Sequence, residues 1–343
     1  MIGLNGSTFA SGLARKSLEG LLSVWERIFQ ANLTYHARPR NAGDMGIWSA
    51  PRPDLPPLGL VLQGPVLRSN NFTLESVKLY KRTFPGTTIV LSTWKSEPPS
   101  VLEPFKQLGV EVLANDPPAN PGQQNFNYQL ISSSAGIARA AEMGAQYVMK
   151  TRTDQRVCGV NLQPLLMNLL ETFPLRTPSV QKRRLIVPGI GTLKSRLYGV
   201  SDMLQFGHID DMRLYWGAAQ TDNRVLPNEK LTRRQFAMRR VCEVYLATEF
   251  LKAIGHKLDW TLRDSWQSFG DYFCIVDSSA LDLYWPKYDR FREYRRLIYS
   301  QRSVDEPVTF LEWMTYYTGE VFRHEIPEWI LDAESSVLEP PKR

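Results

Sequence analysis

The chain has few cysteines and no long apolar run. Its 343 residues include three cysteines, Cys158, Cys242 and Cys274, with neither CxxC spacing nor a nearby histidine. This pattern argues against a disulfide framework or a zinc site and predicts buried, reduced thiols. No stretch reaches the roughly 20 apolar residues that a membrane-spanning helix needs, and charges interrupt the amino terminus too often for a signal peptide. We therefore expect a cytoplasmic protein.

Two motifs that bind nucleotides in other folds are also missing. The sequence contains neither GxGxxG nor GxxxxGK[ST], which weakens the case for hydride transfer and for hydrolysis of nucleoside triphosphates. Its four histidines show no metal-ligand spacing. The composition is that of a globular protein, with 43% apolar and 22% charged residues. A net charge of +6 suits contact with phosphates on nucleotides, lipids or nucleic acid without choosing among them.

Changes in sequence pattern divide the chain into three parts. Residues 1–57 contain an amphipathic helix followed by a linker rich in proline, glycine and asparagine. Residues 58–277 form an α/β domain, because short apolar runs alternate with segments of helical periodicity. Residues 278–343 form an aromatic and basic extension that we expect to pack on the core. The main domain is therefore predicted to start at Leu58.

The alternation in the main domain predicts a parallel sheet. LGLVLQ and TTIVLS read as strands, and the helical segment FTLESVKLYKRTF separates them. Two more helix-and-strand units follow, ending in VEVLA and QYVMK. Helical crossovers between buried strands normally produce a single Rossmann-like sheet, which binds ligands beyond the carboxyl ends of its strands. Candidate nucleotide-binding residues near these ends are Gln63, Gly64, Pro65, Thr93, Asn125 and Asn127. Simple turns and helix capping by asparagine are the alternative interpretations.

The segment from Lys150 to Arg156 carries the most distinctive charge pattern. Arg152, Asp154 and Arg156 alternate with uncharged residues directly after an apolar strand, and alternate residues of an extended segment share a face. We therefore expect the three side chains to point the same way. The carboxylate could bind a divalent cation or a sugar hydroxyl, and the guanidinium groups could bind a diphosphate. The alternative is a ladder of surface salt bridges.

Three acidic residues are candidates for a general base that deprotonates an acceptor hydroxyl. Asp202 opens the strand-like segment DMLQFGH, Glu243 opens a helical segment, and Asp271 lies farther along the chain. Glu243 could instead complement the dipole of its helix. The sequence leaves the choice among the three open.

Several basic clusters occur, and the one at 290–296 is interleaved with aromatic residues. Such a cluster is usually a solvated surface. It could also meet anionic lipid head groups or a phosphorylated, lipid-linked acceptor, which would bring the protein to the inner face of a membrane. Nucleic acid is a third alternative, but no nucleic-acid-binding motif accompanies the charge, so we expect no such partner.

In the order and content of its motifs the sequence resembles the WavE family of lipopolysaccharide-synthesis proteins. The resemblance rests on LVLQGPV, FTLESVKLYKRTFPGTTIVLSTW, QNFNYQLISSSAGI, GAQYVMKTRTDQR and SDMLQFGHIDDM. It implies an A-type glycosyltransferase-like α/β fold with a single sheet that binds a nucleotide sugar. It also implies transfer of a sugar to lipopolysaccharide core, O-antigen or capsule.

The resemblance places Asp154 where A-type glycosyltransferases carry an acidic, metal-binding motif, so it implies Mg²⁺ or Mn²⁺ as a cofactor. The sequence departs from that motif, because Arg152 stands where a first aspartate is expected. A guanidinium could replace part of the metal's charge. The missing carboxylate also leaves open a degenerate fold that binds or scaffolds without catalysis.

Overall fold

A computed structural model of the chain describes residues 7–30, 32, 36–289 and 306–333. It separates into two compact units, Met1–Pro39 and Arg40–Arg343. The first unit contains helix α1 (Ser7–Phe29). Several large apolar side chains of α1 are exposed, among them Leu21, Ile28 and Phe29. The second unit contains the sheet.

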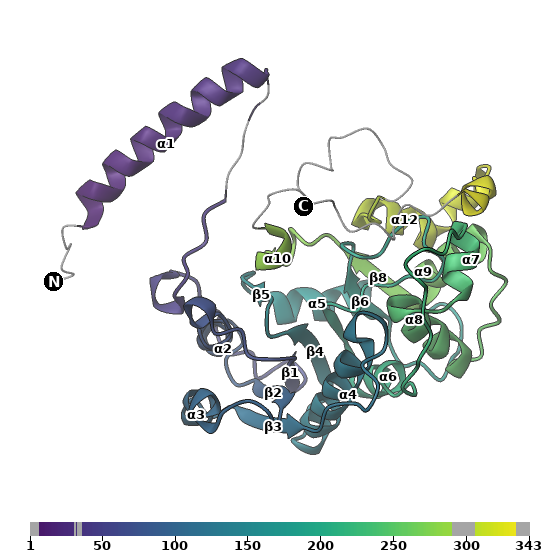
Figure 1. The fold of residues 1–343 in the computed structure, drawn as a ribbon, viewed down its shortest axis with the longest axis horizontal. Helices are drawn as coiled ribbons and strands as arrows, with labels where there is room; N and C mark the ends of the chain where they lie inside the picture. The colour runs from purple at the N-terminus through teal and green to yellow at the C-terminus, as the bar shows by residue number, and fades with distance from the viewer. Residues whose placement is uncertain (1–6, 31, 33–35, 290–305, 334–343) are drawn as a thin grey trace. The chain divides into compact units, whose positions relative to one another are not determined.

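The main sheet has seven strands in the order β3-β2-β1-β4-β7-β6-β8. Their bounds are β1 (Leu58–Gln63), β2 (Thr88–Trp94), β3 (Glu111–Asn115), β4 (Tyr147–Arg152), β6 (Leu185–Pro188), β7 (Gln205–His208) and β8 (Phe273–Val276). Strands β1 to β4 pair in parallel, β7 is antiparallel to β4 and β6, and β8 is parallel to β6. The predicted fold class, an α/β domain built on one main sheet with parallel first strands, is confirmed (Figure 1).

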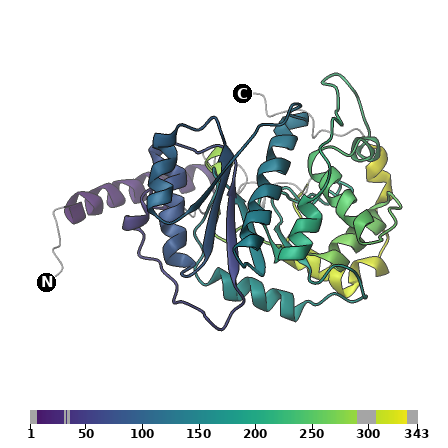
Figure 2. The same ribbon diagram turned by 90° about the horizontal axis from the view of Figure 1, so that it is seen from below.

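Helices lie on both faces of this sheet (Figure 2). They are α2 (Phe72–Thr83), α3 (Pro99–Gln107), α4 (Phe126–Glu142), α5 (Leu162–Thr172), α6 (Ile209–Trp216), α7 (Arg233–Met238), α8 (Cys242–Ala253) and α9 (Leu262–Tyr272). Helix α4 lies close to β1 because it has a glycine at the contact. A Cβ added to Gly136 would stand 2.5 Å from a methyl group of Val61. None of the helices among the described residues has the length and hydropathy to cross a membrane.

The remaining elements are short or follow the sheet. Strand β5 (Arg156–Val157) pairs antiparallel with β9 (Leu283–Tyr284), and α10 (Pro286–Asp289) follows β9. Helix α12 (Phe310–Thr318) packs on α9, with Trp313 fully buried. Single-turn 3-10 helices occur at η1 (Ala42–Asp44), η2 (Ser69–Asn71), η3 (Gln123–Asn125), η5 (Glu320–Arg323) and η6 (Glu328–Asp332).

Candidate active site

The carboxyl ends of β1 and β4 meet at the point where the strand order reverses. Chain order runs outward from β1 to β3 on one side and from β4 on the other, so β1 and β4 flank the topological switch point. The Thr153 amide donates to the carbonyl oxygen of Gln63 at 3.0 Å, and the Thr153 hydroxyl donates to that of Pro65 at 2.6 Å. Gly64 between them has a φ of +114°, a conformation that side chains disfavour. Open α/β sheets bind ligands at such a point.

Arg152 and Asp154 form a bidentate ion pair at this edge. The Arg152 Nε donates to Asp154 Oδ1 at 2.7 Å, and its Nη2 donates to Oδ2 at 2.9 Å. Each side chain keeps 29% of its surface exposed. The indole N–H of Trp285 also donates to Oδ2, at 3.2 Å. Burial alone would raise the pKa of Asp154, but the hydrogen bonds from Arg152 and Trp285 lower it below its usual value, so the carboxylate is ionised.

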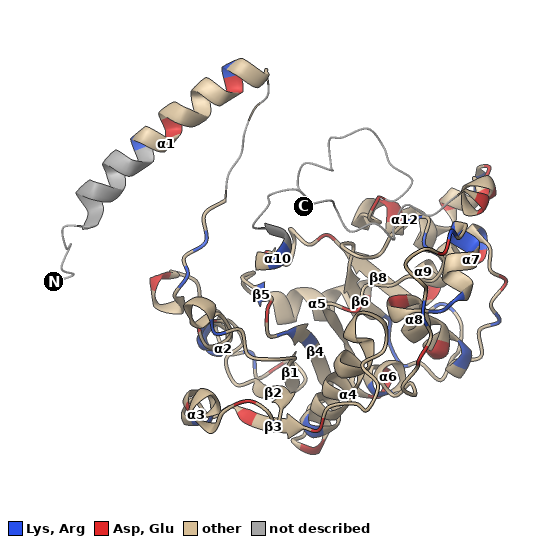
Figure 3. Ribbon diagram, in the orientation of Figure 1, with Lys and Arg blue, Asp and Glu red and all other residues tan. Residues whose placement is uncertain are grey.

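Lys150, two residues before Arg152 on β4, contacts the backbone of Asp202. It is fully buried in β4, and its ammonium donates to the backbone carbonyl of Asp202 at 2.5 Å and lies 4.3 Å from the centre of the Trp216 ring. Burial lowers the pKa of Lys150 to about 7, against the opposing charge of Asp202. Figure 3 shows the basic positions of β4 in blue within a largely uncharged sheet. A lysine so deep in the sheet holds Asp202 beside the end of β4.

The charges of Asp202 and Glu243 act on each other in the folded protein. Asp202 precedes β7 and is 7% exposed, and Glu243 lies in the first turn of α8 with 26% of its side chain exposed. Arg196 Nη1 stands 3.5 Å from Glu243 Oε2. Burial raises the pKa of Glu243, the charge of Asp202 raises it further, and Arg196 opposes both. A carboxyl group with a raised pKa is a better proton acceptor near neutral pH.

Tyr215 adds a polar group to this acidic pair. Its side chain is fully buried on α6, and its hydroxyl has no hydrogen-bond partner among the described residues. Burial, and then the charges of Asp202 and Glu243, raise the pKa of Tyr215 far above its usual value. The hydroxyl therefore stays protonated.

Arg156 does not join Arg152 and Asp154, so the expectation of a shared face is wrong. Strand β4 ends at Arg152, and a turn follows in which the Gln155 amide donates to the carbonyl oxygen of Arg152 at 3.2 Å. The turn breaks the two-residue alternation. The buried Arg156 guanidinium donates to the Ser76 hydroxyl at 3.0 Å and to the carbonyl oxygen of Phe72 at 3.2 Å, so it ties β5 to α2.

Asp271 lies at the amino ends of the parallel strands, whereas the other candidate bases lie at their carboxyl ends. It directly precedes Tyr272 at the end of α9, and β8 then starts at Phe273 in the same direction as β1. The amino end of β8 is therefore near Asp271, whose charge acts on Arg184 at the start of β6. The expectation that Asp271 competes for the role of base is not met.

The predicted amide and hydroxyl ligands have different surroundings. Asn127 is buried, and its amide donates to the carbonyl oxygens of Asn120 and Thr221, at 3.0 and 2.8 Å, which makes its role structural. Asn125 is exposed before α4 and makes no capping hydrogen bond with its side chain. Thr93 is fully buried, and its hydroxyl has no partner in the described part of the chain. The Gln63 side-chain oxygen accepts a hydrogen bond from Ser132 at 3.0 Å.

The residues near Asp154 do not fit a divalent cation. Both carboxylate oxygens already accept hydrogen bonds from Arg152, and Arg152 occupies the position of a second acidic ligand. Mg²⁺ and Mn²⁺ sites are built from several oxygen donors. In the described ranges, no group of three or more His, Cys, Asp or Glu side chains could hold a metal ion.

Sequence reasoning missed Arg196, Tyr215 and Trp285. Trp285 is 131 residues from Asp154 in sequence, so no local pattern connects the two. Lys150 did carry a signal, because a lysine inside an apolar strand needs a reason to be buried. The basic cluster at 290–296 lies outside the described residues.

Comparison with known protein families assigns the chain to one family. The profile of the WavE lipopolysaccharide synthesis family matches residues 58–259, more than half of the chain. No curated protein sequence matches significantly.

Solved structures give weaker matches. Mannose-1-phosphate geranyltransferase from Thermus thermophilus is 15% identical with a TM-score of 0.26, and the match covers 42% of this chain and only 44% of that one. A glycosyltransferase involved in glycosylation of the major capsid of PBCV-1 is 13% identical over 47% of this chain and 66% of that one, with a TM-score of 0.24.

Glucosyl-3-phosphoglycerate synthase from Mycobacterium tuberculosis, solved with Mn²⁺, UDP and glucosyl-3-phosphoglycerate, is 13% identical over 65% of this chain and 73% of that one, with a TM-score of 0.31. These TM-scores are too low to carry a functional assignment.

Proposed function

Because the chain belongs to the WavE lipopolysaccharide synthesis family, we propose that it transfers a sugar from a nucleotide-sugar donor to a surface polysaccharide. The acceptor would be lipopolysaccharide core, O-antigen or capsule. If it is lipid-linked, the enzyme meets it through a peripheral contact at the cytoplasmic face of a membrane.

One observation carries the proposal. At the switch point, the Arg152–Asp154 pair follows β4 and lies next to the Gln63-Gly64-Pro65 turn. Lys150 of the same strand holds the backbone of Asp202 at this carboxyl edge. This edge is where an open α/β sheet binds nucleotides. It combines a cation for a diphosphate with carboxylates for a hydroxyl proton, the two requirements of sugar transfer from a nucleotide.

In this proposal the donor diphosphate lies over the turn after β1 and against Arg152. Glu243 receives the proton of the acceptor hydroxyl, and Asp202 makes Glu243 more basic through its charge. Arg196 holds the Glu243 carboxylate in place at 3.5 Å. Gln63 and Thr93 are buried near the ends of the strands beneath the donor, and the exposed Asn125 offers an amide to the sugar or ribose.

A thermal-shift screen against UDP, GDP, CMP, ADP and dTDP tests donor binding, because a ligand of the native state raises its apparent stability. We expect one nucleotide to stabilise the protein. That nucleotide then identifies the sugar donor for a transfer assay with membrane extracts as the acceptor. Nucleotide binding without transfer to any acceptor would contradict the proposal and favour a binding or scaffold protein.

A further inference from the structure

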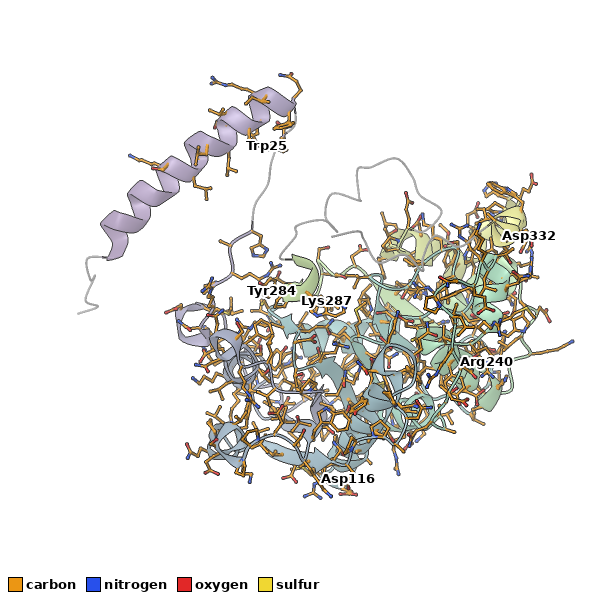
Figure 4. All side chains as sticks on the ribbon, viewed as in Figure 1. Trp25, Asp116, Arg240, Tyr284, Lys287 and Asp332 are labelled. Atoms are coloured by element: carbon orange, nitrogen blue, oxygen red, sulfur yellow. The ribbon has the colours of Figure 1, made fainter. Side chains whose placement is uncertain are left out.

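Arg152, Asp154 and Trp285 contact one another at the switch point. Besides the two hydrogen bonds to Asp154, the Arg152 guanidinium lies 5.1 Å from the centre of the Trp285 ring. The same indole donates its N–H to Asp154 at 3.2 Å. Trp285 lies on the segment between β9 and α10, between Tyr284 and Lys287 as labelled in Figure 4. Three contacts from two distant segments thus fix one guanidinium.

The contacts that fix Arg152 also occupy Asp154. A divalent cation at this carboxylate would have to displace the guanidinium and would find no second acidic ligand two residues earlier. It would also lie next to the positive charge of Arg152, which repels it. The fixed guanidinium of Arg152 therefore stands where a metal-binding motif would hold its cation.

We propose that the chain binds its donor without a divalent cation, with Arg152 contacting the diphosphate and with Asp154 and Trp285 as positioning residues. This inference rests on the proposed sugar transfer and adds which cation neutralises the donor diphosphate. A guanidinium presents five N–H donors in one plane, of which Asp154 takes two in Arg152, and the Arg152 side chain is 29% exposed at the carboxyl edge. Holding the fork in place beforehand reduces the entropy lost when the diphosphate binds.

The chemical step balances without a metal. The bond between the anomeric carbon and the phosphate oxygen breaks, and its electron pair stays on that oxygen. The acceptor oxygen forms the new bond to the anomeric carbon, and its proton passes to a carboxylate, for which Glu243 is the candidate. Arg152 stabilises the charge that develops on the leaving diphosphate.

Calorimetric titration of the full chain with the stabilising nucleoside diphosphate tests the inference. We expect equal affinity in EDTA and in Mn²⁺, and a loss of about 10- to 100-fold in Arg152→Ala, the effect of losing a charged hydrogen bond. Asp154→Asn should weaken binding by a smaller factor, because the guanidinium remains but loses its orientation. Trp285→Phe keeps the ring and should bind more tightly than Trp285→Ala.

Three outcomes separate this inference from the proposed function. Binding in Mn²⁺ that disappears in EDTA would overturn the inference and leave the proposed transfer intact. Binding in EDTA that is unchanged in Arg152→Ala would overturn the role of Arg152. The absence of binding by all five nucleotides, with or without metal, would overturn the proposed function and the inference with it.

Discussion

Charged side chains are used differently at the two ends of the strands in the main sheet. The amino edge is the side at which β1 and β4 begin, and the carboxyl edge is the side at which they end. At the amino edge, the carboxylate of Asp211 accepts hydrogen bonds from the backbone amides of Lys182 and Arg183, both at 2.8 Å. Nearby, Arg184 donates to the backbone carbonyls of Phe173 and Pro174, at 2.8 and 3.0 Å. At the carboxyl edge, Arg152 and Asp154 pair with each other, and each side chain keeps 29% of its surface exposed.

This difference separates charges that hold the fold from charges that can act on a ligand. A side chain bonded to buried backbone groups cannot leave them without exposing an unsatisfied donor or acceptor. A partly exposed ion pair such as Arg152–Asp154 keeps charged surface in reach of a ligand without giving up its own hydrogen bonds. Acidic residues that look alike in the sequence therefore have different roles at the two edges.

The largest difference in transfer rate should appear between substitutions of an acidic residue at the carboxyl edge and of one at the amino edge. Glu243→Gln removes the proposed proton acceptor and should lower the transfer rate by about 10²- to 10⁴-fold. Asp271→Asn, at the amino edge, should change the rate less than about twofold, since a surface substitution away from the site has little effect. Initial rates with the identified donor check both. Equal losses in the two variants would contradict the division between the edges.

The pH dependence of transfer tests whether Asp202 acts on Glu243. Burial, reinforced by Asp202, raises the pKa of Glu243. Because the carboxylate form accepts the proton, kcat/KM should fall as the pH drops through this raised pKa. Asp202→Asn removes a negative charge, so the fall should move to lower pH. A fall at the same pH in both proteins would argue against coupling between the two carboxyl groups.

A second comparison uses two arginines that are four residues apart. Arg156→Met removes a buried guanidinium and its hydrogen bonds to the Ser76 hydroxyl and the Phe72 carbonyl, so the free energy of unfolding should decrease by about 2–4 kcal/mol. Nucleotide affinity should be unchanged in the surviving folded protein. Arg152→Met should show the reverse, with weaker nucleotide binding and little change in stability. Urea denaturation and calorimetry distinguish the two results.

The smallest effect should appear at the amino edge as a dependence of stability on pH. Burial raises the pKa of Asp211 from 3.8 to about 6 on folding. The folded protein then holds this proton more tightly than the unfolded chain, so the group stabilises at low pH and its contribution is lost as the pH rises through about 6. Asp211→Asn should flatten the change of Tm across this range. An unchanged slope would show that Asp211 does not titrate there.

Local sequence pattern predicted the parallel half of the fold well. Strands β1 to β4 follow from short apolar runs and the helical periodicity between them, and that periodicity also placed Gly64 and Asp154 at strand ends. The same reasoning failed at Arg156, because the turn after Arg152 depends on hydrogen bonds of Thr153 to the distant Gln63 and Pro65.

Nonlocal pairing decided the rest of the site. Asp202 reaches the carboxyl edge because β7 runs antiparallel to β4, and Asp271 reaches the amino edge because β8 runs parallel to β6. Neither direction can be read from the residues of the strands themselves. Trp285 and Arg196 meet their partners across long sequence separations, which periodicity does not report.

Hydrogen–deuterium exchange with the nucleotide selected by thermal shift tests the central claim most directly. A ligand at the switch point should slow exchange at the backbone amides of 63–68 and 152–156, with no change at 182–184 and 209–213 on the amino edge. Protection confined to the amino edge, or spread equally over both edges, would contradict the placement of the active site at the carboxyl ends of β1 and β4.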